Sequence, residues 1–179
     1  MPSVVYFVAI SLDGFVAAAD GSQDWLQEFE SGPDVGAGFD EFYTDVDGVI
    51  MGRRAYEQVL RANAAVFSGN PVWVYSHSPQ SAELKNVRFT AKPPGALLEE
   101  MADCGVTRAW LAGGPETAAL FQREGLISEY IVTVIPRILG SGIPLFTSQG
   151  IQRPLDFSRC RAFTSGLVEL TYRAASANP

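Results

Sequence analysis

Two consecutive glycines, Gly113 and Gly114, separate an apolar run from a helical pattern that begins at Pro115. Because glycine has no β-carbon, such a turn lets a ligand approach the backbone, and the N–H groups at the start of the helix attract an anion. Proline suits the first helical position, since the N–H that it lacks would have no partner there. We therefore expect a phosphate group to bind at this turn. A tight connection without any ligand explains the glycine pair equally well.

A second turn of this kind is Gly52-Arg53-Arg54, which follows an apolar run. Positive side chains at a helix N-terminus oppose the helix dipole by roughly 0.3 to 1 kcal/mol each, so two arginines there are unfavourable unless they bind an anion. Two solvated surface arginines are the alternative interpretation. Together, the two turns predict a site for the pyrophosphate of a dinucleotide. Neither turn is a P-loop, and Gly36-Ala37-Gly38 lacks the third glycine and the preceding strand of a Rossmann fingerprint.

The elements that must position these turns are short apolar strands that alternate with helical patterns. We expect helices from about Phe39 to Val46, from Arg53 onward, from Ala96 to Cys104 and from Pro115 to Glu124, with a helical turn at Trp25 to Phe29. We expect strands at Val4–Ile10, Gly48–Gly52, Pro71–Ser76, Val87–Thr90, Ala109–Ala112, Tyr130–Ile135, about Cys160–Thr164 and Leu167–Tyr172. This order predicts an α/β fold with a mixed, mainly parallel central sheet. The last two strands have no helix between them, so they should be antiparallel.

Length and charge restrict the class of protein further. A chain of 179 residues that is 47% hydrophobic predicts one domain over residues 1–179. A net charge of -7 with only 13 Lys and Arg argues against a nucleic-acid partner. No apolar run approaches the ~18 residues of a membrane span, and the apolar start has no basic leader. Because Cys104 and Cys160 stand far apart without a ligand cluster, we expect a cytoplasmic protein without disulfides or bound metal.

Four blocks of sequence resemble, in the same order, the C-terminal reductase domain of riboflavin-biosynthesis deaminase-reductases, which belongs to the dihydrofolate reductase superfamily. The blocks are Ser11-Leu12-Asp13-Gly14-Phe15-Val16, Met51-Gly52-Arg53-Arg54-Ala55-Tyr56-Glu57, Ala112-Gly113-Gly114 and Leu139-Gly140-Ser141-Gly142-Ile143-Pro144-Leu145-Phe146. Stand-alone bacterial relatives share this order, and the resemblance extends from Val4 to Tyr172. It implies a dihydrofolate-reductase-like three-layer fold, with helices on both faces of the sheet and NADPH as the cofactor.

The resemblance also implies which residues bind NADPH. The backbone of Ala9 and Ile10 is expected to meet the nicotinamide amide, and Gly14 to lie in a mobile loop over it. The ligands implied for the phosphates and the adenosine are Gly52, Arg53, Arg54, Ser76, His77, Ser78, Gly113, Gly114, Glu116 and Thr117. His77, the sole histidine, either pairs with a 2′-phosphate when protonated or is incidental.

One position departs from the family pattern. The family usually has a threonine where this chain has Ala55, and the threonine hydroxyl helps to bind phosphate. Its loss should weaken cofactor binding by about 1 kcal/mol.

Hydride transfer requires mainly orientation from the protein, with an acid or water to supply the proton. In dihydrofolate reductases a carboxylate on the helix after the first strand contacts the substrate. On the corresponding helix, Asp40 lies nearest the edge of the apolar face and Glu41 points away, so Asp40 is the first catalytic candidate, with a solvated charge as the alternative. Asp13 is the second candidate, or else it caps its own turn. Trp25 is expected to form an aromatic wall of the substrate pocket or to belong to the core.

These observations predict an oxidoreductase that transfers a hydride from NADPH to a small heterocycle, which is a pterin, a folate or an aminopyrimidine-like ring. The alternative is a module that binds NADP(H) without turnover, as a sensor or a partner subunit. A hydrolase is disfavoured, because the chain has no G-x-S-x-G motif and only one histidine. The many apolar residues after Tyr130 are compatible with a homodimer.

Overall fold

The computed structural model describes residues 1–26, 35–61, 69–77, 84–147 and 152–175. The chain divides into two compact units. The first unit comprises Met1–Tyr6 and Val46–Ser128, and the second comprises Phe7–Asp45 and Glu129–Pro179. Strands β1 (Ser3–Ser11) and β7 (Ile127–Ile135) begin in the first unit and end in the second.

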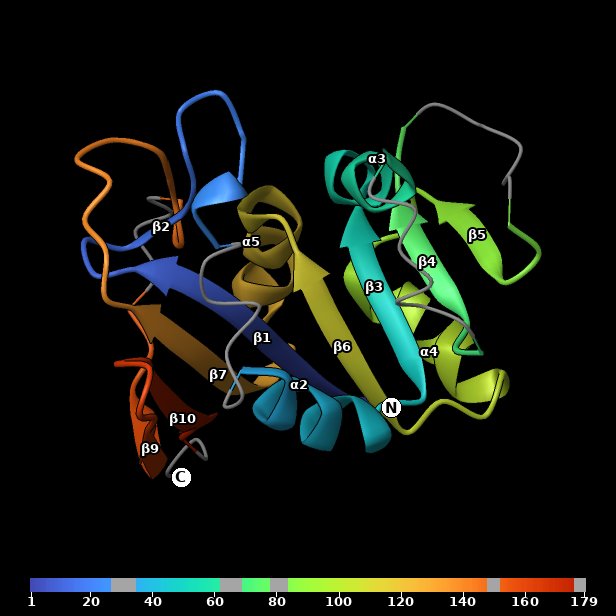
Figure 1. The fold of residues 1–179 in the computed structure, drawn as a ribbon. Coiled ribbons are helices and arrows are strands. Elements are labelled where there is room, and N and C mark those ends of the chain that lie inside the picture. The colour runs from blue at the N-terminus through green and yellow to red at the C-terminus, as the bar shows by residue number, and fades with distance from the viewer. Residues whose placement is uncertain (27–34, 62–68, 78–83, 148–151, 176–179) are drawn as a thin grey trace. The chain divides into compact units, whose positions relative to one another are not determined.

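A parallel sheet forms the centre of the first unit. Its strands are hydrogen-bonded in the order β5-β4-β3-β6-β1 (Figure 1). Besides β1, they are β3 (Gly48–Gly52), β4 (Val72–Tyr75), β5 (Val87–Thr90) and β6 (Arg108–Gly113). Val49, Trp73 and Leu111 are fully buried within three of these strands. Such continuous apolar runs are expected where a parallel sheet is covered on both faces.

Helices cover both faces of this sheet. They are α3 (Arg53–Arg61), α4 (Pro94–Asp103) and α5 (Pro115–Glu124). Tyr56 of α3 packs edge-on against Phe89 of β5, and Tyr75 of β4 packs edge-on against Phe121 of α5. Phe89 is paired with Val74, so it points to the face opposite Tyr75. Therefore α3 lies on one face and α5 on the other, where α4 packs beside it.

Asp47 holds the first residues of β3 and β6 beside each other. Its carboxylate accepts hydrogen bonds from the backbone N–H of Thr107 and Arg108 and, at 2.6 Å, from the Thr107 hydroxyl. Partial burial raises the pKa of Asp47, but these hydrogen bonds outweigh it, and the pKa lies below its ordinary value. Because the two strands run parallel from this point, their far ends also lie level, with Met51 paired to Gly113.

The second unit contains antiparallel strands and the helix α2 (Val35–Thr44). β7 pairs with β10 (Val168–Ala174), which pairs in turn with β9 (Leu155–Ala162). A smaller ladder joins β2 (Phe15–Ala17) to β8 (Ile143–Pro144), and a short 3-10 helix covers Asp24–Leu26. Phe42 of α2 stacks on Phe7 with ring centroids 4.6 Å apart, so an aromatic contact attaches the helix to β1.

The predicted fold class is confirmed, because the sheet is mixed and mainly parallel and its C-terminal strands are antiparallel. The strand Val87–Thr90 and the helix Pro115–Glu124 have the predicted bounds. The prediction for β9 was wrong at its start, which is Leu155 and not about Cys160. Residues 155–160 are all exposed, so the strand has no buried face to give it an apolar alternation.

Other elements also begin earlier than predicted. α2 begins at Val35 instead of Phe39, α4 at Pro94 instead of Ala96, and β7 at Ile127 instead of Tyr130. Pro94 stands in the first turn of α4, where a missing N–H is tolerated. The turn expected from Trp25 is the 3-10 helix, and Phe29 lies outside the described residues.

Within the described ranges, no helix is long and apolar enough to cross a membrane. The thiols of Cys104, in the first unit, and Cys160, in the second, are free and exposed.

Candidate functional site

In the first unit, the turn from β3 to α3 lies directly against the turn from β6 to α5. A β-carbon placed on Gly52 would lie 2.7 Å from the Thr117 hydroxyl oxygen, 3.7 Å from the Gly114 nitrogen and 3.8 Å from the Gly113 oxygen. Since β-carbons essentially never make contacts under 3.0 Å, a residue larger than glycine at position 52 would force the Thr117 side chain to shift. The structure thus brings together four of the residues predicted to bind phosphate.

The backbone between β6 and α5 is open on its outer side. A β-carbon on Gly113 or Gly114 would meet no described atom within 4 Å. Gly113 has a φ of 110°, a conformation that favours glycine, and a cis peptide bond joins it to Gly114. Both glycines therefore leave room beside the main chain, and binding of a ligand there stays a prediction.

The start of α5 has N–H groups available for an anion. Gly114 is the N-cap residue and makes no side-chain capping hydrogen bond. The helical ladder begins with the Ala118 N–H, which donates to the Gly114 carbonyl at 3.0 Å. The N–H groups of Glu116 and Thr117 precede that first helical bond, so they have no acceptor within the helix. This end of α5 carries the partial positive charge of the helix dipole.

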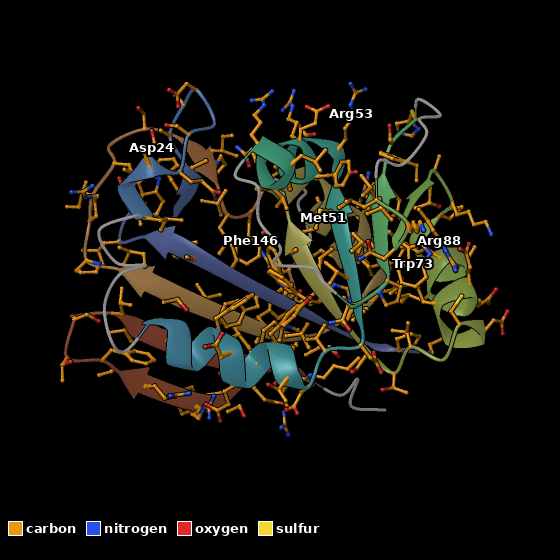
Figure 2. The ribbon with its side chains drawn as sticks, turned by 45° about the vertical axis from the view of Figure 1, so that its right-hand side comes forward. Asp24, Met51, Arg53, Trp73, Arg88 and Phe146 are labelled. Carbon is orange, nitrogen blue, oxygen red and sulfur yellow. The ribbon has the colours of Figure 1, made fainter. Side chains whose placement is uncertain are left out.

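The two arginines at the start of α3 differ in their partners. Arg53, labelled in Figure 2, donates from Nε to Glu57 of its own helix at 2.7 Å. Arg54 has a looser ion pair with Glu116 of α5, at 3.9 Å, and the two side chains are 85% and 84% exposed. Such an exposed pair contributes little to stability. Arg54 is therefore free to exchange Glu116 for another anion.

The end of β4 lies next to the first of these turns. Tyr75 is paired with Gly52, Ser76 follows it, and the Ser76 N–H donates to the Thr90 carbonyl at 2.9 Å. His77 is exposed, and Ser78 lies outside the described residues. Burial raises the pKa of Tyr75, and the adjacent charge of Glu124 raises it further, so the tyrosine is neutral at physiological pH.

In the second unit, Asp13 joins two loops that are far apart in sequence. Its carboxylate accepts hydrogen bonds from the N–H of Leu139 at 3.1 Å and of Gly140 at 2.7 Å. The Ser11 hydroxyl, which is fully buried, also hydrogen-bonds to it and is the main reason that the pKa of Asp13 is lowered. These backbone contacts reach a second loop, whereas capping of its own turn and a catalytic role for Asp13 stay predictions. Gly14 follows with a φ of 87°.

Trp25 lies in a small apolar cluster of the second unit. The ring is 7% exposed and packs with Ile135 and Leu167, and Ala9 and Leu139 pack against the same cluster. The indole N–H is buried and has no hydrogen-bond partner among the described residues. A buried hydrogen-bond donor without an acceptor is unfavourable, so an acceptor from a ligand would stabilise it. Trp25 thus belongs to a core and also retains a donor that a ligand could use.

The two acidic residues of α2 are both exposed. Asp40 faces solvent, and its contact with a substrate stays a prediction. The Glu41 side chain is 64% exposed and accepts a hydrogen bond from Arg161 of β9 at 2.9 Å. Glu41 thus attaches the helix to the strand, a contact that the sequence did not predict.

A buried acid that sequence reasoning missed is Glu169 of β10. Its side chain is 4% exposed and lies 3.3 Å from Arg159 and 3.9 Å from Arg161. The sequence contains no signal for it, because Glu169 and Thr171 alternate with the apolar residues of β10 and would be expected to face solvent, whereas the structure buries both of them. A carboxylate at an inward position of a strand requires a charged partner.

No cluster of three metal-ligating side chains occurs among the residues that the structure describes. The predicted site residues fall into two groups. Those for phosphate and adenosine lie in the first unit, whereas Ala9, Ile10, Asp13, Gly14, Trp25 and Asp40 lie in the second.

Residues 2–169 match the model of the RibD C-terminal domain family. The uncharacterized protein YwjB of Bacillus subtilis is 41% identical over 143 residues, which cover 79% of this chain and 81% of YwjB. The uncharacterized protein YyaP of the same bacterium is 26% identical over 180 residues, which cover 94% and 93% of the two chains.

Solved structures show the same fold. A putative riboflavin biosynthesis protein from Shewanella sp. PV-4 superposes with a TM-score of 0.87 at 27% identity, over 98% of this chain and all of that one. A diaminohydroxyphosphoribosylaminopyrimidine deaminase/5-amino-6-(5-phosphoribosylamino)uracil reductase from Thermotoga maritima superposes with a TM-score of 0.75 at 15% identity. That match covers 97% of this chain and 57% of the Thermotoga chain, and it supports the fold alone.

Proposed function

The chain belongs to the RibD C-terminal domain family, and from that membership we propose that it is an NADPH-dependent reductase that transfers a hydride to a small nitrogen heterocycle. The name of the Thermotoga structure includes the reduction of an aminopyrimidine derivative. We extend the reaction class to this chain and propose an aminopyrimidine-like ring as its substrate, with pterins and folates as the other candidates.

The observation that carries the proposal is the contact between the two strand-to-helix turns of the first unit. A dinucleotide pyrophosphate needs several donors converging from more than one element. Position 52 supports this convergence, because a β-carbon there would lie 2.7 Å from the Thr117 hydroxyl, so the starts of α3 and α5 lie close together.

The residues of these turns fit the phosphates of NADPH. The open backbone at Gly113 and Gly114 leaves room for a phosphate, and the N–H groups of Glu116 and Thr117 would donate to it. Arg54 would exchange its loose contact with Glu116 for the phosphate charge. Although Ala55 supplies no hydroxyl, that of Thr117 lies between the turns.

The other predicted ligands have narrower roles in the proposal. Arg53 would add charge at the start of α3 while it remains paired to Glu57. Ser76, His77 and Ser78 follow β4, and we assign them to the adenosine end. The arginines carry a permanent positive charge, so they provide most of the preference for a 2′-phosphate.

We assign the nicotinamide and substrate contacts to residues of the second unit. The backbone of Ala9 and Ile10 would meet the carboxamide, and Gly14 would lie in the loop beside it. Among the described residues, the buried N–H of Trp25 has no acceptor, which suits a carbonyl or ring nitrogen of the heterocycle. Asp40 is the exposed acid that remains as a candidate for substrate contact, since both oxygens of Asp13 already accept backbone hydrogen bonds.

NADPH, when bound, supplies the hydride. The chain itself has to bind the phosphates, orient the two rings and exclude water, and these tasks require no nucleophile and no metal ligand from the protein. A water molecule or Asp40 would bring the proton to the reduced ring.

Ligand-dependent unfolding temperature is the first test. NADPH at 100 times its Kd should stabilise the protein by about 2.7 kcal/mol, whereas NADH should have a much smaller effect at the same concentration. Oxidation of NADPH, followed at the nicotinamide absorbance, should then be screened against aminopyrimidines, pterins and folates. The proposal fails if neither nucleotide raises the unfolding temperature.

A module that binds NADP(H) without turnover is the second candidate. The hydrogen bonds that occupy Asp13 and the exposure of Asp40 favour it, since neither acid is held ready to give a proton. This candidate predicts that NADPH stabilises the protein but is not oxidised in the presence of any of these rings.

We also propose that two copies of the chain associate through β9. This strand is the last in the hydrogen-bonding order of the sheet, and it exposes 39% of Leu155 and 63% of Phe157. An unpaired edge with exposed apolar residues is a common site of association. Analytical ultracentrifugation should show a dimer that Phe157→Lys dissociates.

A further inference from the structure

The second unit contains a connection between two loops that the proposed reduction does not itself explain. Residues 12–14 connect β1 to β2, and residues 136–142 connect β7 to β8. Asp13 accepts the N–H of Leu139 at one carboxylate oxygen and the N–H of Gly140 at the other. The Leu12 N–H donates to the Arg137 carbonyl at 2.7 Å. We call this set of contacts the Asp13 clasp.

The clasp continues into a hydrogen-bonded ladder. The Leu145 N–H donates to the Gly14 carbonyl at 2.9 Å, and β2 then pairs with β8. Gly142 packs so tightly on the Ala17 carbonyl that a β-carbon at position 142 has no space. The two segments are therefore joined along their whole length, and Asp13 is the only acidic side chain that the described structure places in these hydrogen bonds.

The carboxylate of Asp13 is in use as an acceptor. The Ser11 hydroxyl bonds to it, and the Ser11 oxygen in turn accepts the Phe15 N–H at 3.0 Å. These bonds favour the ionised form, and the pKa of Asp13 accordingly lies below its ordinary value. An ionised carboxylate with both oxygens engaged is a poor proton donor and a strong acceptor of charge-assisted hydrogen bonds.

The clasp also has a packed connection to the proposed ring-binding residues. Leu139, whose N–H the clasp fixes, packs its side chain against the cluster of Trp25, Ile135 and Leu167. Ala9, at the end of β1, packs against the same cluster. A shift of Leu139 would therefore be transmitted to Trp25 and to the strand end that holds Ala9.

We propose that Asp13 is a positioning residue of the reductase, and that its carboxylate holds Leu139 and Gly140 in place and thereby orients Trp25 and Ala9 toward the substrate and nicotinamide rings. The inference rests on the proposed function, because it assigns Asp13 a part in hydride transfer other than the proton donation first considered.

The test uses Asp13→Asn and Asp13→Ala in the whole chain. Asp13→Asn keeps one oxygen as an acceptor, but its amide N–H would face the backbone N–H of Leu139 or Gly140. Hydride transfer should therefore slow by about tenfold in Asp13→Asn, and by more in Asp13→Ala, which keeps no acceptor. The pH profile of the transfer step should keep its shape in both variants. The concentration of NADPH that gives half-maximal stabilisation should change less than threefold, because the phosphate ligands lie elsewhere in the chain.

Asp20→Asn is the matched control. Asp20 lies in the connection that follows β2, is exposed, and accepts the Ser22 N–H at 2.9 Å. Within the described part of the chain Asp20 makes a turn of its own and joins no second loop, so its substitution should leave the transfer rate unchanged.

Hydrogen exchange separates failure of this inference from failure of the proposed function. The amides of Leu139 and Gly140 should exchange about tenfold faster in Asp13→Asn than in the parent chain, and this does not depend on any activity. Unchanged exchange at these two amides would overturn the clasp. Loss, in Asp13→Asn, of a fall in rate with rising pH that the parent chain shows would instead make Asp13 a proton donor. If NADPH fails to stabilise the parent chain, the proposed function fails whatever the exchange shows.

Discussion

The paired turns of the first unit and the Asp13 clasp of the second are built in opposite ways. At Gly52 the arrangement depends on an atom that is missing, because a β-carbon would come within 2.7 Å of the Thr117 hydroxyl. At Asp13 it depends on atoms that are present, because two carboxylate oxygens each accept a backbone hydrogen bond. The contact of the two turns at Gly52 should therefore be sensitive to an added atom, and the contacts of the Asp13 side chain to removed ones.

Adding one carbon at Gly52 should have the largest effect. Gly52→Ala forces the β-carbon against the Thr117 hydroxyl and separates the two turns, so the free energy of unfolding should fall by about 1 to 3 kcal/mol, the usual range for overpacking. The Kd for NADPH should rise by about a hundredfold, since two sets of phosphate donors are displaced together. Urea denaturation and fluorescence titration measure the two quantities.

Gly95→Ala is the control for this addition. It adds the same atom in the same unit, but its β-carbon would make only an ordinary contact of 3.6 Å with Glu124. It should leave NADPH binding unchanged and affect stability by no more than about 1 kcal/mol. Equal effects of the two substitutions would show that the turns have no special sensitivity to added atoms.

Asp47 is a carboxylate acceptor in the first unit. Its substitution tests whether sensitivity to a lost acceptor is particular to the Asp13 clasp or also occurs in the first unit. Asp47→Asn weakens the hydrogen bonds to Thr107 and Arg108, and should lower the free energy of unfolding by about 2 kcal/mol. The pKa of Asp47 is lower in the folded protein than its ordinary value of 3.8. Its contribution is therefore complete above that value and is lost as the pH falls through the folded pKa.

The difference in stability between the parent chain and Asp47→Asn should accordingly narrow when urea denaturation is repeated at pH 3 instead of pH 7. Asp45→Asn, an exposed acid two residues earlier, serves as the comparison and should have little effect at either pH. A difference that stays constant with pH would mean that the charge of Asp47 is irrelevant to stability.

Removing a charge beside the turns should affect binding more than folding. Arg54→Ala should raise the Kd for NADPH about tenfold, equivalent to 1.4 kcal/mol, and leave the unfolding temperature without ligand nearly unchanged, because its ion pair is exposed. Arg53→Ala should have the smaller effect, since Glu57 already holds that guanidinium. Titrations at two salt concentrations measure both, and a larger loss for Arg53 would reverse the assignment.

The smallest expected effect is a gain. Glu116→Gln keeps the backbone N–H but removes the carboxylate that pairs with Arg54, so NADPH should bind about twofold more tightly. If binding weakens instead, the Glu116 side chain contacts the cofactor directly. Isothermal titration calorimetry resolves a change of this size when the two proteins are measured side by side.

The same contrast, between glycine turns and a carboxylate that binds distant backbone, explains which region could be predicted from the sequence. Gly52, Gly113 and Gly114 could be recognised because a residue type without a β-carbon has few structural uses at the end of a strand. Asp13 could not be assigned, because an aspartate in a loop is equally suited to capping and to catalysis. Its partners, Leu139 and Gly140, are 126 and 127 residues away and contribute only backbone atoms.

Burial decided which strands could be located. The apolar runs of β3, β4 and β6 identified a sheet covered on both faces. By contrast, β9 is exposed along almost its whole length. It pairs with β10 through backbone hydrogen bonds, which leave no pattern of residue types in the sequence. The ion pair of Glu41 with Arg161 was missed for the same reason, since it required the position of that strand.

The two free cysteines give this chain a practical property. Cys104 and Cys160 are its only thiols, both are exposed, and each unit carries one. The unaltered protein can therefore be labelled with one spin probe per unit, with no cysteine to introduce or remove. Pulsed dipolar spectroscopy on that pair would measure any movement of one unit against the other when a nucleotide binds.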